Sequence, residues 1–160
     1  MRLSSLTLIG GAVAAPATAA TVNVTLPRLS VAEYHKPYVA GWIEPAGDTG
    51  AARSLFVWYD VKKQGNEPGT KWLADLRSWW RKAGRTMKLP ADGVSGATRG
   101  PGSYTIPLPA GLAPGKYVVN VEATRENGNR ELVSVPVTVP GGGGRAAGRT
   151  ELGAVVVSAK

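Results

Sequence analysis

The chain has 160 residues, a formal net charge of +8, no cysteine and a single histidine. This length suffices for one domain with a sizeable core and is too short for two ordinary domains. The missing cysteines exclude disulfides, iron–sulfur clusters and thiolate metal sites, and one histidine cannot build a histidine-rich zinc, copper or haem-pair site. Any electron-transfer role would therefore need an acquired cofactor.

The first 20 residues are typical of a secretory signal peptide. Arg2 supplies a minimal positive region, residues 3–13 are apolar, and residues 17–19 (Ala-Thr-Ala) form a small-x-small cleavage site. The apolar run is too short for a bilayer span, which needs about 20 residues. We therefore predict a cleaved signal over residues 1–20, a single mature domain over residues 21–160, and a periplasmic protein that does not span the membrane.

Alternation of apolar and polar residues predicts β-strands through most of the mature chain. The first strand covers residues 22–26, and strands over residues 38–44 and 54–61 follow. Residues 55–59 are apolar without interruption, which indicates burial on both faces of the sheet. A short strand over residues 104–108 lies between prolines.

The clearest supersecondary signal is a β-hairpin centred on Asn127-Gly128. Apolar residues alternate on both sides of this dipeptide, which favours a type I′ turn with positive φ at both central residues. Pro136 cannot donate a ladder hydrogen bond, so the second strand is expected at a sheet edge or with a bulge. We interpret residues 141–144 as a flexible glycine break before a last strand over residues 152–159.

Residues 70–83 follow a helical period instead. Thr70 is a candidate N-cap and Gly84 a candidate C′ residue. The apolar residues of this segment share one helical face: they are Trp72, Leu73, Leu76, Trp79 and Trp80. Such a stripe is more often core that packs a helix on a sheet than a stacking platform for a planar cofactor.

About seven strands and one helix in roughly 140 residues predict a mainly all-β fold, an antiparallel β-sandwich of immunoglobulin or transthyretin type with one short tryptophan-rich helix. Between Lys71 and Arg99 there are seven basic and two acidic residues. This excess is either a solvated surface or a site for anionic cell-surface material or a phosphorylated cofactor. Export argues against nucleic acid as a partner.

Residues 92–98, Asp-Gly-Val-Ser-Gly-Ala-Thr, lie in a loop-like segment over residues 89–102. Long irregular segments in compact domains are more often functional than idle. The heptapeptide resembles the acceptor sequence of bacterial flavoproteins, in which an aspartate and two variable residues precede Ser/Thr-Gly-Ala-Thr/Ser. There the last hydroxyl bears the flavin phosphate, so the resemblance implies covalent FMN, phosphoester-linked to Thr98. The alternative is an ordinary surface turn.

The resemblance also implies roles for the neighbouring residues. Recognition by a flavin transferase is expected to use the other constrained motif positions: Asp92, Ser95, Gly96 and Ala97. Two of these, Gly96 and Ala97, add no bulk beside the acceptor hydroxyl. Arg99 is a candidate partner for the phosphodiester charge, and the tryptophans of the predicted helix are weaker candidates for holding the flavin.

The mature chain as a whole resembles a bacterial family of predicted periplasmic proteins, domain of unknown function 2271. The matching segments are residues 35–44, 56–60, 72–81, 92–102, 114–117, 123–128 and 151–155. Members of this family tend to occur with PepSY-domain membrane proteins and flavin transferases. The resemblance thus implies extracytoplasmic electron transfer by a flavin, with a PepSY-type partner and metal-ion reduction as a candidate endpoint.

Two function classes stay open: an electron carrier with covalent FMN, and a non-redox binding module that docks a membrane partner or an anionic surface. The sequence contains no Ser-His-Asp order, phosphate loop or metal-ligand spacing, which disfavours an independent enzyme. His35 is more often a surface or capping residue than a flavin contact. Glu122 and Glu126 are expected on a solvated face opposite Arg125 and Arg130.

Overall fold

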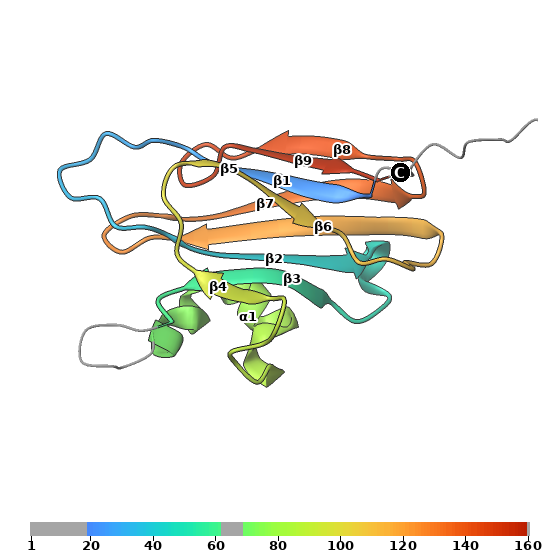
Figure 1. Cartoon of the computed structure of the whole chain (residues 1–160), viewed down its shortest axis with the longest axis horizontal. Coiled ribbons are helices and arrows are strands. Elements are labelled where there is room, and N and C mark those ends of the chain that lie inside the picture. Colours follow the sequence, from blue (N-terminus) through green and yellow to red (C-terminus); the bar gives the residue numbers. More distant parts are fainter. Residues whose placement is uncertain (1–18, 62–68, 160) are drawn as a thin grey trace, which may run out of the picture.

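Two β-sheets lie face to face, and short helices cover the outer side of one of them (Figure 1). This computed structural model describes residues 19–61 and 69–159. Most of the expected signal peptide, residues 1–18, therefore lies outside the described part of the chain. The first sheet has the strand order β5-β1-β9-β8, and the second has the order β4-β3-β2-β6-β7.

The strands and helices follow one another along the chain with few long connections. The strands are β1 Thr21–Leu26, β2 Tyr38–Pro45, β3 Arg53–Tyr59, β4 Ser95–Ala97, β5 Gly102–Pro107, β6 Gly115–Thr124, β7 Arg130–Val139, β8 Gly144–Ala147 and β9 Ala154–Ser158. The helices are the 3₁₀ turns η1 Ala46–Asp48, η3 Gly69–Asp75 and η4 Gly84–Thr86 and the α-helix α1 Arg77–Lys82. The predicted β-sandwich is confirmed, with strands over 45% and helix over 14% of the described residues.

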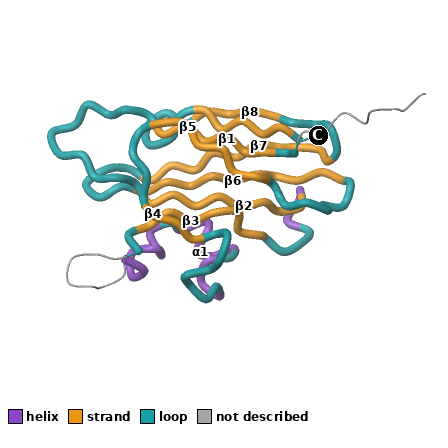
Figure 2. Tube along the Cα trace, in the orientation of Figure 1, coloured by secondary structure: helices purple, strands orange, loops and turns teal. Residues whose placement is uncertain are grey.

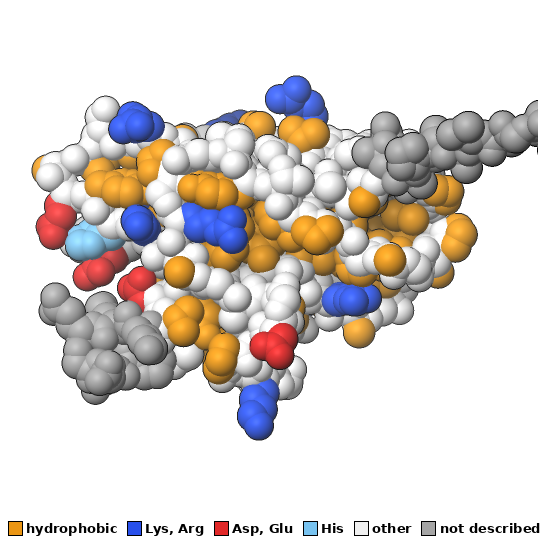
Figure 3. Space-filling view, viewed as in Figure 1, with side chains coloured by type: hydrophobic (Ala, Val, Ile, Leu, Met, Phe, Trp, Pro, Cys, Tyr) orange, Lys and Arg blue, Asp and Glu red, His pale blue; other side chains and the backbone are white. Residues whose placement is uncertain are grey.

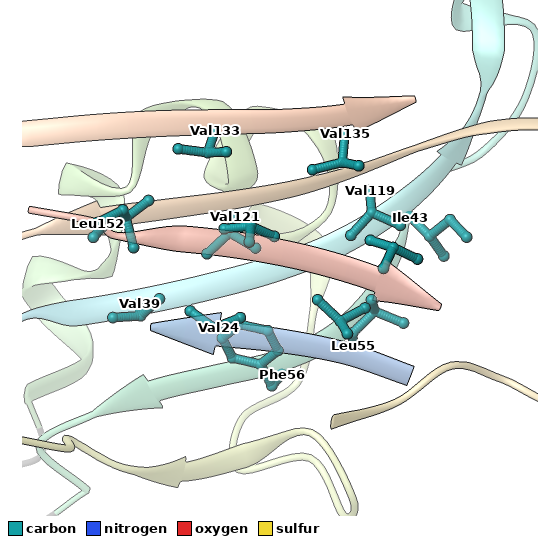
Figure 4. Close-up of a cluster of buried hydrophobic side chains, with 14 of the residues drawn as sticks. Val24, Val39, Ile43, Leu55, Phe56, Val119, Val121, Val133, Val135 and Leu152 are labelled. Atoms are coloured by element: carbon teal, nitrogen blue, oxygen red, sulfur yellow. The ribbon is translucent and has the colours of Figure 1, made fainter. Parts of the chain in front are cut away.

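The alternating residues of the strands fill the space between the two sheets. Figure 4 shows valine and leucine side chains of both sheets pointing toward one another, among them Val24, Val121, Val135 and Leu152. All four are fully or almost fully buried. Burial of each such side chain contributes about 1.5–3 kcal/mol, so this layer accounts for a large part of the stability of a chain without cysteine.

The second sheet is also covered on its outer face, by the helical segment. There Trp42, Val57 and Tyr59 pack against Leu76 and Trp79. Strand β3 is therefore buried on both sides, with one set of side chains in each layer. This confirms the interpretation of residues 55–59.

The helical segment differs from the single helix that we predicted over residues 70–83. A 3₁₀ helix ends at Asp75, Leu76 adopts a non-helical ψ of 70°, and α1 contains only the six residues Arg77–Lys82. The carboxylate of Glu122 on β6 accepts hydrogen bonds from the backbone N–H groups of Ser78 (3.1 Å) and Trp79 (2.8 Å). The side chain of Glu122, from a distant strand, thus accepts the hydrogen bonds at the start of α1. The predicted continuous helix with Thr70 as N-cap and Gly84 as C′ residue does not form.

The hairpin between β6 and β7 forms as predicted, but its turn is different. Thr124 pairs with Arg130, so the loop has five residues rather than two. Asn127 has a φ of 55°, whereas Gly128 has no positive φ, which makes the type I′ prediction wrong. A side chain at Gly128 would place its Cβ 2.6 Å from Cζ of Arg125, so a close approach explains the glycine. Strand β7 lies at a sheet edge, as we predicted from the proline at position 136.

The glycine-rich segment after β7 is an ordered turn, not the flexible break that we expected. Thr138 and Gly142 exchange two backbone hydrogen bonds of 2.8 and 2.9 Å, and Gly141 has a φ of 84° that favours glycine. The turn carries the chain from one sheet to the other, where β8 pairs with β9. The sequence did not predict β8, because its residues Gly144–Ala147 lack β-branched and aromatic side chains.

Candidate functional site

Residues 95–97 of the heptapeptide form a short edge strand instead of the loop that we predicted. This strand, β4, pairs in parallel with the end of β3, with Tyr59 opposite Ala97. A further backbone hydrogen bond of 2.9 Å joins the N–H of Val57 to the carbonyl of Val94. Because β4 is the outermost strand of its sheet, its other side pairs with no strand of the described residues.

The heptapeptide begins in a turn that a hydrogen bond to the hydroxyl of Ser95 stabilises. The hydroxyl of Ser95 accepts a hydrogen bond of 3.0 Å from the N–H of Ala91. The carbonyl of Ala91 in turn accepts from the N–H groups of Val94 (3.1 Å) and Ser95 (2.9 Å). Gly93 has a φ of 72°, which favours glycine, and Asp92 is exposed. The aspartate of the motif is thus presented to solvent.

Trp58 of β3 lies against Gly96 of β4, and Arg99 stacks on Trp58. A Cβ on Gly96 would lie 3.3 Å from Cδ1 of Trp58, closer than an ordinary contact, so the indole would have to shift by a few tenths of an ångström to admit a side chain. The guanidinium of Arg99 lies over the rings of Trp58 (4.3 Å) and Tyr104 (5.0 Å). Arg99 therefore stacks on aromatic rings in this state, and its pairing with a phosphodiester stays a prediction.

Thr98 follows β4 directly and its side chain is partly exposed. Its hydroxyl donates a hydrogen bond of 3.2 Å to Oδ1 of Asp60, the residue that follows β3. Asp60 also faces Tyr38: burial, together with the negative charge of Asp60, raises the pKa of Tyr38 to about 12. The hydroxyl of Tyr38 donates a hydrogen bond of 3.2 Å to the carbonyl of Gly69. A side chain at position 69 would place its Cβ 2.0 Å from that hydroxyl oxygen.

A groove of about 700 Å³ opens beside Thr98 at this end of the second sheet. The ends of β4, β3 and β6 and the start of β2 meet here, and Figure 2 shows the connecting loops gathered at the same end. In Figure 3 acidic side chains flank the pale blue histidine there. The lining residues are Tyr34, His35, Lys36, Tyr38, Asp60, Trp72, Asp75, Thr98, Thr124, Arg125 and Glu126.

Arg125 forms a buried ion pair in the wall of the groove. Its Nε and Nη2 donate to the two carboxylate oxygens of Glu151 at 2.8 and 3.1 Å. These hydrogen bonds raise the pKa of Arg125 above its ordinary value. The third nitrogen, Nη1, is buried and has no hydrogen-bond partner among the described residues. Arg125 is only 8% exposed.

The two glutamates of β6 and its turn have different environments. Glu122 is fully buried, where it binds the start of α1 and pairs with Arg130; the expected solvated position is wrong for this residue. Glu126 is exposed, as predicted, and lies 3.8 Å from Nδ1 of His35. Nε2 of His35 lies 3.3 Å from the carboxylate of Glu33. His35 is thus a groove residue held between two acidic side chains.

The three tryptophans of the helical segment do not form one platform. Trp79 is fully buried and donates from its indole to the hydroxyl of Ser54 (2.9 Å). Trp80 packs partly buried against the same core. Trp72 alone lines the groove; it is 36% exposed, and Nζ of Lys71 lies 4.4 Å from its ring centroid. The expected core role thus holds for Trp79 and Trp80.

Sequence reasoning missed Asp60 as a contact of the heptapeptide, and Tyr38 and Arg125 as residues of the groove beside it. A polar residue directly after the buried run 55–59 was the one signal that pointed to Asp60. The described residues contain no cluster of three or more acidic or histidine side chains that could hold a metal ion. No helix within the same residues is long and apolar enough to cross a membrane.

The family model described as "Predicted periplasmic protein (DUF2271)" matches residues 19–154. The match covers most of the chain, so the chain belongs to this family, in agreement with the predicted periplasmic location. No curated protein and no solved structure is similar enough to match.

Proposed function

We propose that this chain, as a member of a family of predicted periplasmic proteins, carries covalent FMN on Thr98 and transfers electrons outside the cytoplasm. The observation that carries the proposal is the pattern of residues 92–98, an aspartate followed at fixed spacing by Ser-Gly-Ala-Thr. When bound, the flavin supplies the redox chemistry, and the protein supplies its position and its exposure. A PepSY-type membrane protein is the proposed partner, with metal-ion reduction as a candidate endpoint.

The attachment is a group transfer without a redox step. The hydroxyl oxygen of Thr98 attacks the phosphorus of the FMN half of a flavin adenine dinucleotide bound to a flavin transferase. A new bond forms between that oxygen and phosphorus, the bond between this phosphorus and the bridging oxygen breaks, and AMP leaves with the bridging oxygen. The proton of the Thr98 hydroxyl passes to the transferase or to solvent.

The accessibility of the heptapeptide supports recognition by such an enzyme. Asp92 and Ala97 are exposed, and Ser95, Gly96 and Thr98 are partly exposed. The outer edge of β4 faces no other described strand, and an extended edge of this kind suits docking by strand addition. An enzyme can therefore reach the motif without unfolding the sheet.

The charges near Thr98 also bear on the fit of the phosphodiester. Asp60 lies next to the acceptor hydroxyl and would repel the new negative charge. Lys36 lines the same groove, and Arg99 is the next residue along the chain. We propose that Arg99 leaves its stacked position to pair with the phosphodiester, because charge-assisted hydrogen bonds are stronger than stacking at an exposed site.

Co-expression with a periplasmic flavin transferase tests the proposal directly. Intact-mass measurement should show a gain equal to one FMN minus one water, together with flavin absorbance in the purified protein. Thr98→Ala should abolish the gain, Thr98→Ser should retain it, and Asp92→Ala should reduce it. Thr86→Ala is a matched control, because Thr86 is an exposed threonine outside the motif. An unchanged wild-type mass, or labelling that persists in Thr98→Ala, refutes the proposal.

The second candidate is a non-redox binding module. It is favoured by the groove itself, whose aromatic and charged lining exists independently of any modification. This function predicts a colourless native protein and binding to a membrane partner or an anionic surface that weakens steeply with salt. Binding would also occur in protein that carries no flavin.

A further inference from the structure

We propose that the groove beside Thr98 holds the isoalloxazine ring of the attached flavin against Trp72, with Arg125 in the wall at the far end. This inference rests on the proposed function and goes beyond it, because a tethered flavin need not touch the protein. It assigns the ring a binding site made of residues outside the heptapeptide.

The order of the strands gives the direction in which the flavin extends. Ala97 pairs with Tyr59 on β3, β2 lies next to β3, and Tyr38 on β2 pairs with Thr124 on β6. Thr98 and Arg125 therefore stand three strand steps apart at the same end of the sheet, about 14 Å at a spacing of about 4.8 Å. A phosphoribityl chain separates phosphorus from ring, so the ring would lie along this line rather than at Thr98 itself.

The size and lining of the groove suit a planar heterocycle. Its volume of about 700 Å³ is within the range of about 300–1,000 Å³ found for small-molecule sites. Tyr34, Tyr38 and Trp72 provide aromatic surface in the lining. Trp72 is 36% exposed although the neighbouring Trp79 is fully buried. The indole of Trp72 is a planar aromatic surface of the kind on which another ring can stack.

The wall of the groove also contains a donor that needs an acceptor. Nη1 of Arg125 is buried without a hydrogen-bond partner in residues 19–61 and 69–159, while its other two nitrogens bind Glu151. A buried donor left unpaired is unfavourable, because it has lost its hydrogen bonds to water. The pyrimidine edge of a flavin carries carbonyl oxygens that would accept from this nitrogen after a small opening of the wall.

The mixed charge of the lining is compatible with this ligand. The lining contains the acidic residues Asp60, Asp75 and Glu126 and the basic residues Lys36 and Arg125. The oxidised isoalloxazine ring is uncharged, so its burial needs no excess of either sign. The phosphodiester, which does carry charge, stays at Thr98 on the exposed rim.

The experiment compares wild type, Trp72→Leu, Trp80→Leu and Thr124→Met after modification by the transferase. Intact mass reports attachment, and flavin fluorescence reports the position of the ring, because a stacked indole quenches flavin emission. The wild-type flavin should be quenched several-fold relative to the same sample after complete proteolysis. Trp72→Leu removes the quenching indole and Thr124→Met adds bulk to the groove without an indole, so both should raise the emission above that of the wild type. Trp80→Leu is the matched control and should not.

The outcomes separate this inference from the proposed function. Full attachment with emission equal to that of the proteolysed sample, or equal emission in all four proteins, overturns the groove site and leaves attachment at Thr98 standing. If the wild type gains no mass, the proposed function fails. Titration of unmodified Thr98→Ala with free FMN then decides the groove: saturable quenching that Trp72→Leu abolishes supports it, and the absence of such quenching overturns it.

Discussion

Thr98 donates its hydroxyl hydrogen bond to Oδ1 of Asp60 across 3.2 Å. The two residues follow directly after the strands β4 and β3, whose parallel pairing brings their ends together. A phosphoester on the threonine oxygen would remove this donor and place a negative charge beside a carboxylate. The environment of the acceptor hydroxyl is therefore set by a residue 38 positions away in the sequence.

The first prediction concerns Asp60. Asp60→Asn keeps a hydrogen-bond acceptor for Thr98 and removes the charge that opposes a phosphodiester. Two unit charges about 4 Å apart in a water-like environment repel by about 1 kcal/mol, so the variant should be modified about fivefold faster at limiting transferase. Timed intact-mass measurements give the rate. A slower reaction would mean that the carboxylate helps to remove the hydroxyl proton.

The second prediction concerns alkaline pH. The folded protein holds the proton of Tyr38 more tightly than the unfolded chain does, because burial and Asp60 raise its pKa from 10.0 to about 12. The stability that this proton contributes is fully present below pH 10 and is lost as the pH rises toward 12. Denaturation midpoints across this window should fall for the wild type and fall less for Tyr38→Phe. Tyr117→Phe should behave like the wild type; a Tyr38→Phe curve parallel to the wild type contradicts the prediction.

The third prediction concerns acid pH and Glu131. Burial tends to raise the pKa of this carboxylate, but backbone N–H donors of the loop after β8 outweigh it and hold the pKa below the ordinary 4.5. These donors belong to Arg149, Thr150, Glu151 and Leu152. The contribution of Glu131 to stability is thus present above pH 4.5 and is lost as the pH falls through the lowered value.

Glu131→Gln removes this acid-dependent contribution. Because the side chain is partly exposed, we expect a loss of about 1 kcal/mol in the free energy of unfolding at neutral pH. The difference from wild type should shrink when urea denaturation is repeated at decreasing pH. A difference that stays constant with pH would contradict the prediction, because the loss would then not come from the ionised carboxylate.

The fourth prediction concerns the pair Arg125–Glu151, whose side chains are 5% and 1% exposed. Glu151→Gln leaves the guanidinium buried without a counter-charge, which should lower the free energy of unfolding by about 3–5 kcal/mol in urea denaturation. The double variant Arg125→Met with Glu151→Leu should recover most of the loss, because neither charge is then buried alone. A loss below about 1 kcal/mol for Glu151→Gln would indicate that water reaches the pair.

Local patterning predicted the strands because a half-buried sheet imposes a period of two. In β1 the burial of Val22, Val24 and Leu26 follows this period residue by residue. The same reasoning missed β4, since Ser-Gly-Ala has low β propensity. That strand exists because β3 offers it backbone partners, such as the N–H of Val57.

In the helical segment, the sequence pattern predicted one continuous helix where the structure has two. Its apolar spacing matched one continuous helix, and Leu76 and Trp79 are indeed buried on one side. The break at Leu76 depends on Glu122, whose carboxylate takes the N–H groups of the next turn from 44 residues away. A hydrogen bond between distant segments leaves no mark in the local period, so the sequence could not reveal it.

By itself, the sequence determined the β class, most strand positions and the composition of the heptapeptide, because each depends on neighbours along the chain. Only the tertiary structure decided that Thr98 forms a hydrogen bond with Asp60 and that Arg125 lies in the wall of a groove. It also decided that Trp79 is buried in the core whereas Trp72 is partly exposed. These relationships arise where strands from distant parts of the chain end side by side, and strand pairing, not local sequence, sets which residues meet there.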